Sequence, residues 1–121
     1  MIEINKIILN HDTSIKEAMK IIDNSTIKIA LVLDDNKRLI GTVTDGDIRR
    51  SILKGVTLNE SVYHTMNRSF IYALVGDSKE KISKIARDNE VNQVPIVDED
   101  FILIGIEDAT NYFKSPKRVN T

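Results

Sequence analysis

The chain has 121 residues, of which 41% are hydrophobic and 29% charged, with a formal net charge of −1 and no cysteine. The balanced charge argues against nucleic-acid binding and against a polybasic membrane surface, and the absence of cysteine excludes disulfides and thiol chemistry. Because no apolar run is long enough to span a membrane or to form the core of a signal peptide, we expect a cytoplasmic protein.

The first half of the chain predicts a helix, a hairpin and a second helix. Asp12, Thr13 and Ser14 are capping residues, and the apolar residues from Ile15 to Ile22 recur at helical spacing. Runs rich in Ile, Leu and Val around an acidic turn are typical of a β-hairpin. The expected elements after the first helix are a strand over 27–33, a turn over 34–37, a strand over 38–43 and a helix over 45–53 that ends before Gly55.

The second half predicts the same order of elements after a linker. Leu58, Val62 and Met66 follow one another at helical spacing, which predicts a short helical linker packed on the rest of the chain. The elements expected beyond it are a helix over 78–89, strands over 93–97 and 101–106, and a helix over 107–113. Short extra strands are expected near residues 7–8 and 71–72.

An internal repeat organises the sequence. Residues 30–41 and 94–105 share an apolar run, an acidic turn, a second apolar run and a glycine, at a constant offset of 64 residues. One copy is too small to cover its own sheet, so we expect an α/β (α+β) fold in which two pseudo-symmetric small sheets pack together with flanking helices. The predicted units are residues 1–64, residues 65–114 and a tail over 115–121, with a ligand cleft between the first two.

The stretch from Gly41 to Arg50 is the most informative motif. It lies where a strand ends and a helix begins, and a helix N-terminus attracts phosphate. The Thr44 hydroxyl can add a hydrogen bond to a phosphate, Asp47 can accept from two ribose hydroxyls, and Arg49 or Arg50 can reach a phosphate. The alternative is that Thr44 and Asp47 form only a capping box.

Strand, acidic turn, strand, Gly-x-x-Thr-x-x-Asp and helix, twice in tandem, together resemble a pair of CBS (cystathionine-β-synthase) domains over roughly residues 4–113. The family's ligand signature falls on Gly41, Thr44 and Asp47, with Thr42 and Val43 between the first two. The resemblance implies that the threonine contacts phosphate and the aspartate holds the ribose. It also implies wall residues from the second copy, which by position are Asp77, Ser78, Ile82, Gln93, Val94 and Pro95. Among these, the Gln93 amide can read the edge of a base.

The second copy departs from the signature. The offset places Asp108 opposite Thr44 and Asn111 opposite Asp47, and Glu107 adds a further negative charge. Acidic residues at this helix start would repel a phosphate. We therefore expect at most one nucleotide per chain, or an uncharged adenosine-like ligand at the second site.

The string Thr44-Asp45-Gly46-Asp47-Ile48-Arg49-Arg50 narrows the resemblance. It is similar to the CBS pair ahead of bacterial and archaeal sugar-1-phosphate nucleotidylyltransferase domains, and a similar string occurs in arabinose-5-phosphate isomerases. The resemblance implies a regulatory module that binds AMP, ADP or ATP, with Mg²⁺ arriving only with the nucleotide. It further implies allosteric control of a catalytic domain downstream of Thr121.

We expect no catalysis in this chain itself, since His11 and His64 lack a metal-ligand spacing and no glycine-rich phosphate loop is present. One alternative is a non-binding module that holds a homodimer together through its helices, with Met19, Leu53, Leu58, Val62 and Met66 as contributors. Another is a sensor of a different nucleotide or of a sugar phosphate.

Overall fold

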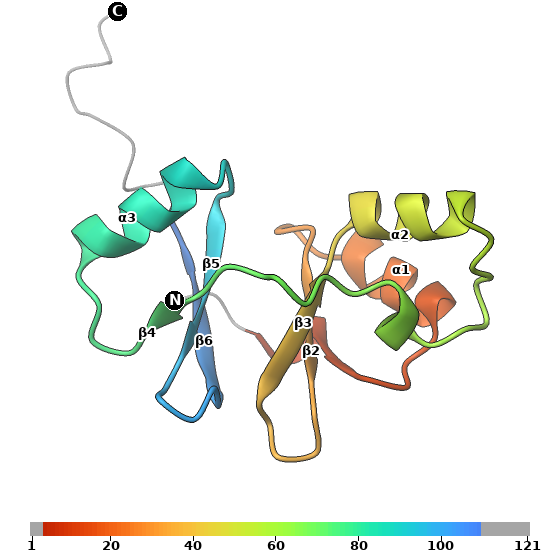
Figure 1. Ribbon diagram of the computed structural model, residues 1–121, viewed down its shortest axis with the longest axis horizontal. Helices are drawn as coiled ribbons and strands as arrows, with labels where there is room; N and C mark the ends of the chain where they lie inside the picture. Colours follow the sequence, from red (N-terminus) through yellow and green to blue (C-terminus); the bar gives the residue numbers. More distant parts are fainter. Residues whose placement is uncertain (1–3, 110–121) are drawn as a thin grey trace, which may run out of the picture.

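The computed structural model describes residues 4–109, which form two lobes, each built on a three-stranded sheet (Figure 1). In Figure 1 the two sheets stand side by side at the centre, and the helices lie on the outer sides. The first lobe contains η1 (Asn5–Ile7), β1 (Ile8–Asn10), α1 (Ile15–Asp23), β2 (Ala30–Leu33), β3 (Leu39–Val43), α2 (Asp45–Leu53) and η2 (Val62–His64). The second lobe contains β4 (Ala73–Leu74), α3 (Lys79–Asp88), β5 (Gln93–Val97) and β6 (Leu103–Asp108).

The two sheets share one topology and one register. In each, a short strand pairs in parallel with the first strand of an antiparallel hairpin, giving the orders β1-β2-β3 and β4-β5-β6. Val32 pairs with Gly41 in the first hairpin and Ile96 with Gly105 in the second, and both hairpins have a register shift one residue later. The predicted hairpins and the 64-residue repeat are therefore confirmed at the level of individual pairs.

Capping serines start the equivalent helices α1 and α3. Ser14 accepts a hydrogen bond from the Glu17 amide at 3.1 Å, and Ser78 accepts one from the Lys81 amide at 3.1 Å. Each helix then turns an apolar stripe toward its own sheet, which gives each lobe a separate core.

The lobes join through a third cluster between the sheets, which includes Leu31 and Leu39 from the first and Val97 and Ile106 from the second. At its edge the two hairpin turns bond to each other through the backbone. The Leu39 amide donates to the Phe101 carbonyl at 2.9 Å, and the Leu103 amide donates to the Lys37 carbonyl at 3.1 Å. The predicted fold class, two pseudo-symmetric sheets packed together, is confirmed.

The linker differs from its prediction, because only Val62–His64 forms a 3₁₀ turn and the remainder is not helical. Its backbone groups bond instead to the start of α1, as when the Ile15 amide donates to the Glu60 carbonyl at 2.8 Å. Val62 and Met66, 0% and 9% exposed, lie in the core of the first lobe, which therefore extends past the predicted boundary at residue 64.

Two element boundaries also differ. The first hairpin strand begins at Ala30 instead of residue 27, because Lys28 has a φ of 59° that breaks the extended backbone. The strand β6 continues to Asp108, where a helix was predicted from Glu107. The rest of that predicted helix, and the tail over 115–121, lie outside the described residues. Within residues 4–109, no helix is long and apolar enough to cross a membrane.

Candidate ligand-binding site

The first turn of α2 is closed by a capping box. The Thr44 hydroxyl oxygen accepts from the Asp47 amide at 3.3 Å, and Asp47 Oδ2 accepts from the Thr44 amide at 3.0 Å. The Thr44 hydroxyl also donates to the same carboxylate oxygen at 3.0 Å. The capping alternative read from the sequence is therefore real, and it holds both side chains at the end of β3.

The second oxygen of the Asp47 carboxylate faces an arginine one helical turn later. Arg50 Nη2 donates to Asp47 Oδ1 at 2.8 Å, and the two side chains are 66% and 15% exposed, respectively. An ion pair with so exposed an arginine contributes only about 0.2–1 kcal/mol. A phosphate can therefore draw the guanidinium away from Asp47 at small cost.

A buried pair of hydroxyls anchors α2 from behind. Thr65 Oγ1 donates to the Asp47 carbonyl at 2.9 Å, and the Ser51 hydroxyl lies 2.5 Å from the same Thr65 oxygen. Because the Thr65 proton is used on the Asp47 carbonyl, Ser51 must donate to Thr65. The sequence pattern did not reveal this link, which fixes the backbone of Asp47 to the segment between the lobes.

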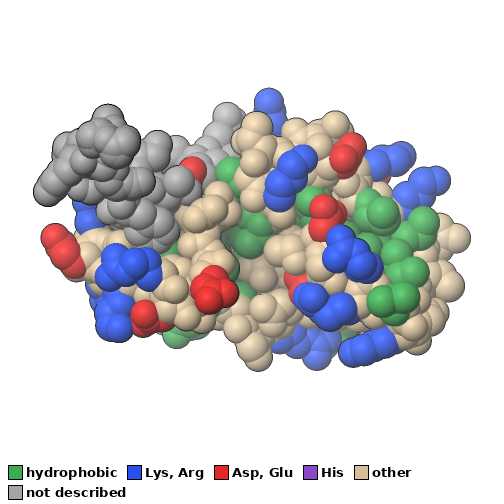
Figure 2. Space-filling model, turned by 90° about the horizontal axis from the view of Figure 1, so that it is seen from above, with side chains coloured by type: hydrophobic (Ala, Val, Ile, Leu, Met, Phe, Trp, Pro, Cys, Tyr) green, Lys and Arg blue, Asp and Glu red, His purple; other side chains and the backbone are tan. Residues whose placement is uncertain are grey.

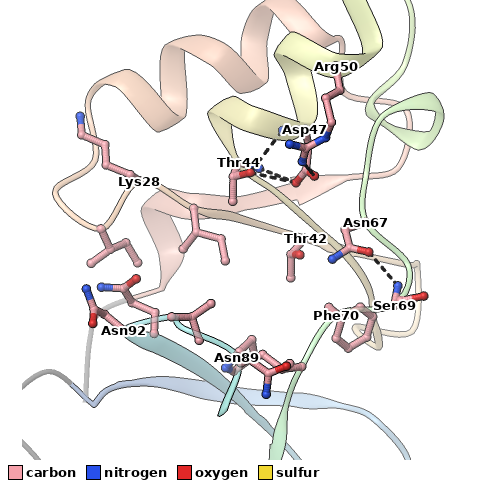
Figure 3. A pocket seen from close by; sticks show the side chains of 16 residues that line it. Lys28, Thr42, Thr44, Asp47, Arg50, Asn67, Ser69, Phe70, Asn89 and Asn92 are labelled. Atoms are coloured by element: carbon pink, nitrogen blue, oxygen red, sulfur yellow. Dashed lines mark hydrogen bonds and ion pairs between the residues drawn. The ribbon is translucent and has the colours of Figure 1, made fainter. Parts of the chain in front are cut away.

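A cavity of about 450 Å³ opens in front of Thr44 and Asp47, and we call it the cleft (Figure 3). Figure 3 shows Thr44, Asp47 and Arg50 on one side, with Asn89 and Asn92 of the second lobe across the opening. The residues that line it are Ile27, Lys28, Ile29, Thr42, Thr44, Asp47, Arg50, Asn67, Ser69, Phe70, Ile71, Asn89, Val91, Asn92, Gln93 and Pro95. Residues of both repeats thus form one cleft.

The structure brings together six of the site residues proposed from the sequence. Those that line the cleft are Thr42, Thr44, Asp47, Arg50, Gln93 and Pro95. The residues that do not line it are Gly41, Val43, Arg49, Asp77, Ser78, Ile82 and Val94. Arg49 points away because successive helical residues face different directions, so only its neighbour Arg50 reaches the cleft.

Core packing and helix capping explain why most of the other predicted site residues do not line the cleft. Val43, Ile82 and Val94 are buried in the cores of their lobes. At the start of α3, Asp77 accepts from the Leu74 amide at 2.8 Å, and Ser78 caps the helix. These side chains support the walls without facing the ligand space.

Gly41 has a packing role. A Cβ atom built on it would lie 2.6 Å from the sulfur of Met66, which packs directly over this strand position. The glycine of the signature therefore allows the linker to pack on β3. Two backbone hydrogen bonds between Thr42 and Asn67, at 3.1 and 2.8 Å, continue that contact to the edge of the cleft.

Several lining residues carried no signal in the sequence. Lys28 donates to the Asp23 carbonyl at 3.0 Å and so covers the C-terminal end of α1. The side-chain amides of Asn92 and Gln93 form no hydrogen bond within the described part of the chain. Loop residues such as Asn67 and Asn92 follow no periodic pattern, and only the packing of the lobes brings them to the cleft.

Another cavity lies beside the C-terminal end of α1. Its volume is about 360 Å³, and its lining residues are Lys6, Ile7, Ile21, Asn24, Ser25, Thr26 and Ile27. Asp108, the counterpart of Thr44, is the last residue of β6, and Asn111 lies outside the described residues. Among the described residues, the second lobe has no counterpart of the capping box at the start of α2.

The fold defines a two-lobed, pseudo-symmetric module with a cleft lined by both lobes. A family model described as "CBS domain" matches residues 2–54. A CBS domain protein from Pyrobaculum aerophilum, complexed with AMP, superposes with a TM-score of 0.76 at 18% identity, over 91% of this chain and 85% of that one. The cytosolic domain of the Mg²⁺ channel MgtE, in complex with ATP, gives a TM-score of 0.74 at 20% identity, over 88% and 43% of the two chains.

A homoserine O-acetyltransferase of Methanobrevibacter ruminantium is 33% identical over 78% of this chain, which covers 19% of that protein. Across the first curated relatives, the chain spans between 16% and 40% of their length. Residues 2–54 belong to the CBS-domain family, and the chain has the fold of a tandem CBS pair, because the second lobe repeats the fold of the matched first lobe.

Proposed function

We propose that this CBS pair is a regulatory module that binds an adenosine nucleotide, AMP, ADP or ATP, in the cleft between its lobes. The proposal rests on the composition of the cleft. One wall is the start of α2, with Thr44, Asp47 and Arg50, and the second lobe contributes a wall of apolar and amide side chains. The two solved CBS structures bound to AMP and ATP support it as neighbours in fold.

On this proposal the phosphate binds at the start of α2. The free amides of the first turn and the positive end of the helix dipole attract the anion. The Thr44 hydroxyl, which donates to Asp47 Oδ2 in this structure, turns its proton to the phosphate, and Arg50 turns from Asp47 to the phosphate in the same movement. The movement exchanges one charge-assisted hydrogen bond for another, so it costs little.

The ribose then takes the place that Arg50 leaves. Asp47 Oδ1 accepts only from Arg50 among the described residues, whereas Oδ2 is held by the capping box. When the guanidinium moves, Oδ1 becomes free to accept from the ribose hydroxyls. Phosphate and ribose binding are therefore coupled through one side chain.

The base occupies the far end of the cleft. Ile27, Ile29, Val91 and Pro95 provide apolar surfaces for its faces. The amides of Asn92 and Gln93 have both donors and acceptors available for its edge. A purine suits this end, because its larger ring system covers more apolar surface than a pyrimidine does.

The regulated activity belongs to a separate catalytic domain, for which we propose a sugar-phosphate nucleotidylyltransferase on the basis of the Thr44–Arg50 string. The enzymes related to this chain are several times longer than it is, which is consistent with a module attached to other domains. A nucleotide that bridges the lobes favours one relative orientation of them, and this difference in affinity is what can regulate an attached enzyme.

A second candidate function, holding a homodimer together, is favoured by an apolar patch on the first lobe. Met19, Ile52, Leu53 and Leu58 are exposed there, Leu53 by 79%. Figure 2 shows apolar side chains gathered at the end of this lobe, beside lysines and arginines. Val62 and Met66, named with them from the sequence, are buried and cannot contribute.

Thermal unfolding at fixed protein concentration tests the proposed function. A ligand present at roughly 100 times its Kd adds about 2.7 kcal/mol to the free energy of unfolding. AMP, ADP or ATP is expected to raise the Tm of the wild type, and Asp47→Asn is expected to lose this rise. Ser14→Ala removes a comparable helix cap outside the cleft and is expected to keep it. If no adenosine nucleotide raises the Tm of the wild type, the chain is better explained as a dimerisation module.

A further inference from the structure

Another cavity adjoins the cleft where Asp47 and Arg50 lie. It has a volume of about 440 Å³, and we call it the side cavity. Its lining residues are Asp47, Arg50, Ser51, Lys54, Val56, His64, Thr65, Met66 and Asn67. Asp47, Arg50 and Asn67 also line the cleft. The two cavities are therefore neighbours, and the Arg50–Asp47 ion pair forms part of the wall between them.

The side cavity has an excess of positive charge. Arg50 and Lys54 line it as cations and His64 as a further N–H donor, while Asp47 is the only acidic residue among the described residues that line it. The Asp47 carboxylate is already engaged by Thr44 and Arg50. Lys54 takes part in no ion pair within residues 4–109. The charge in this cavity is thus suited to an anion that the protein itself does not supply.

The cationic residues of the side cavity lie on α2 and η2 and at their ends, and a hydrogen bond links α2 to the end of η2. Asp47 and Arg50 of α2 and Lys54, its C-cap residue, follow one another at intervals of three and four residues, so they lie along one side of the helix. His64, the last residue of η2, also lines the cavity. The bond between Ser51 and Thr65 ties α2 to the residue that follows His64, so the backbone segments that carry Lys54 and His64 are held together.

We propose that the side cavity receives the distal phosphates of a nucleoside di- or triphosphate whose nucleoside lies in the cleft, and that Lys54 and His64 thereby favour ADP and ATP over AMP. This inference rests on the proposed function, because the nucleoside must first bind in the cleft. Arg50 stands at the junction and contacts the phosphate chain as it passes from one cavity to the other.

The expected size of the effect follows from the contacts. One additional charge-assisted hydrogen bond to a phosphate strengthens binding by about tenfold. We therefore expect ATP, in the absence of Mg²⁺, to bind the wild-type chain about tenfold more tightly than AMP. Removal of the Lys54 charge acts on ATP and leaves AMP alone, since the single phosphate of AMP does not enter the side cavity.

Isothermal titration of the full chain with AMP, ATP and inorganic tripolyphosphate tests the inference, with EDTA present. Lys54→Gln, His64→Ala and their combination are compared with Lys20→Ala, which removes an exposed lysine of α1 that lines neither cavity. The double variant is expected to bind AMP as the wild type does and to lose the preference for ATP. An unchanged AMP affinity also shows that the variants are folded.

The outcomes separate the inference from the proposed function. If neither AMP nor ATP binds the wild type, the proposed function fails, and this inference fails with it. If AMP binds but ATP binds no more tightly, or if the preference survives in the double variant, the inference alone is overturned. Tripolyphosphate is expected to bind more weakly than ATP. Equal affinities would show an independent anion site and would overturn the claim that the two cavities hold one ligand.

Discussion

Arg50 and Asp47, which both line the cleft, form an ion pair of 2.8 Å. The pair satisfies the carboxylate that is proposed to hold a ribose and neutralises the guanidinium that is proposed to hold a phosphate. Nucleotide binding replaces this one internal contact with two external ones. Affinity therefore depends on how readily Arg50 moves, which makes it the first residue to vary.

Arg50→Ala is expected to weaken adenosine nucleotide binding by about tenfold, because a charge-assisted hydrogen bond to the phosphate is lost. Arg49→Ala removes the same charge from the same helix, but Arg49 does not line the cleft. Its affinity is expected to stay within about twofold of the wild type, a difference of roughly 0.4 kcal/mol. Calorimetric titration of the two variants measures the difference. Equal losses would mean that only the overall charge of α2 matters.

Thr65→Val is expected to lower the free energy of unfolding by about 1–3 kcal/mol, because the buried Ser51 hydroxyl and the Asp47 carbonyl lose their partner. Urea unfolding followed by circular dichroism measures this. Thr65→Ser retains the hydroxyl and is expected to recover most of the loss. If the serine variant is as unstable as the valine variant, the methyl group of Thr65 matters more than its hydrogen bonds.

Gly41→Ala is expected to destabilise the fold by about 1–3 kcal/mol through overpacking, since the new methyl group would lie 2.6 Å from the Met66 sulfur. Met66→Ala on its own is expected to destabilise by about 2–5 kcal/mol. The double variant is expected to lose less than the sum of the two, because each change relieves the other. Additive losses in a double-mutant cycle would place the role of Gly41 elsewhere.

Leu53→Glu is expected to weaken self-association if the exposed patch of the first lobe joins two chains, because a charge would have to be buried in the contact. Sedimentation velocity over a range of concentrations measures the effect. Nucleotide affinity is expected to remain unchanged, since Leu53 does not line the cleft. A wild-type chain that stays monomeric at all concentrations would rule out the dimerisation role.

The repeat made the fold predictable, because a 64-residue offset in apolar runs and turns carries through to the same strand register in both hairpins. The Thr44–Asp47 motif was predictable for the same reason, since spacing along a helix start fixes geometry. The conformation of the linker was not predictable, because its apolar residues follow a helical spacing while its backbone bonds to α1. Asn67, Asn92 and Lys28 reach the cleft only through the packing of loops, which no local pattern encodes.

The proposed function depends on the binding of an adenosine nucleotide between the lobes, at Thr44 and Asp47. Titration of the isotopically labelled chain with AMP, followed by amide NMR, tests it most directly. We expect saturable chemical-shift changes at the amides of residues 44–47 of the first lobe and of residues 91–93 of the second, and none around Ser14. Shifts confined to residues 6–7 and 24–26, which line the cavity beside the end of α1, would place the ligand outside the cleft, and the absence of any saturable shift would contradict nucleotide binding altogether.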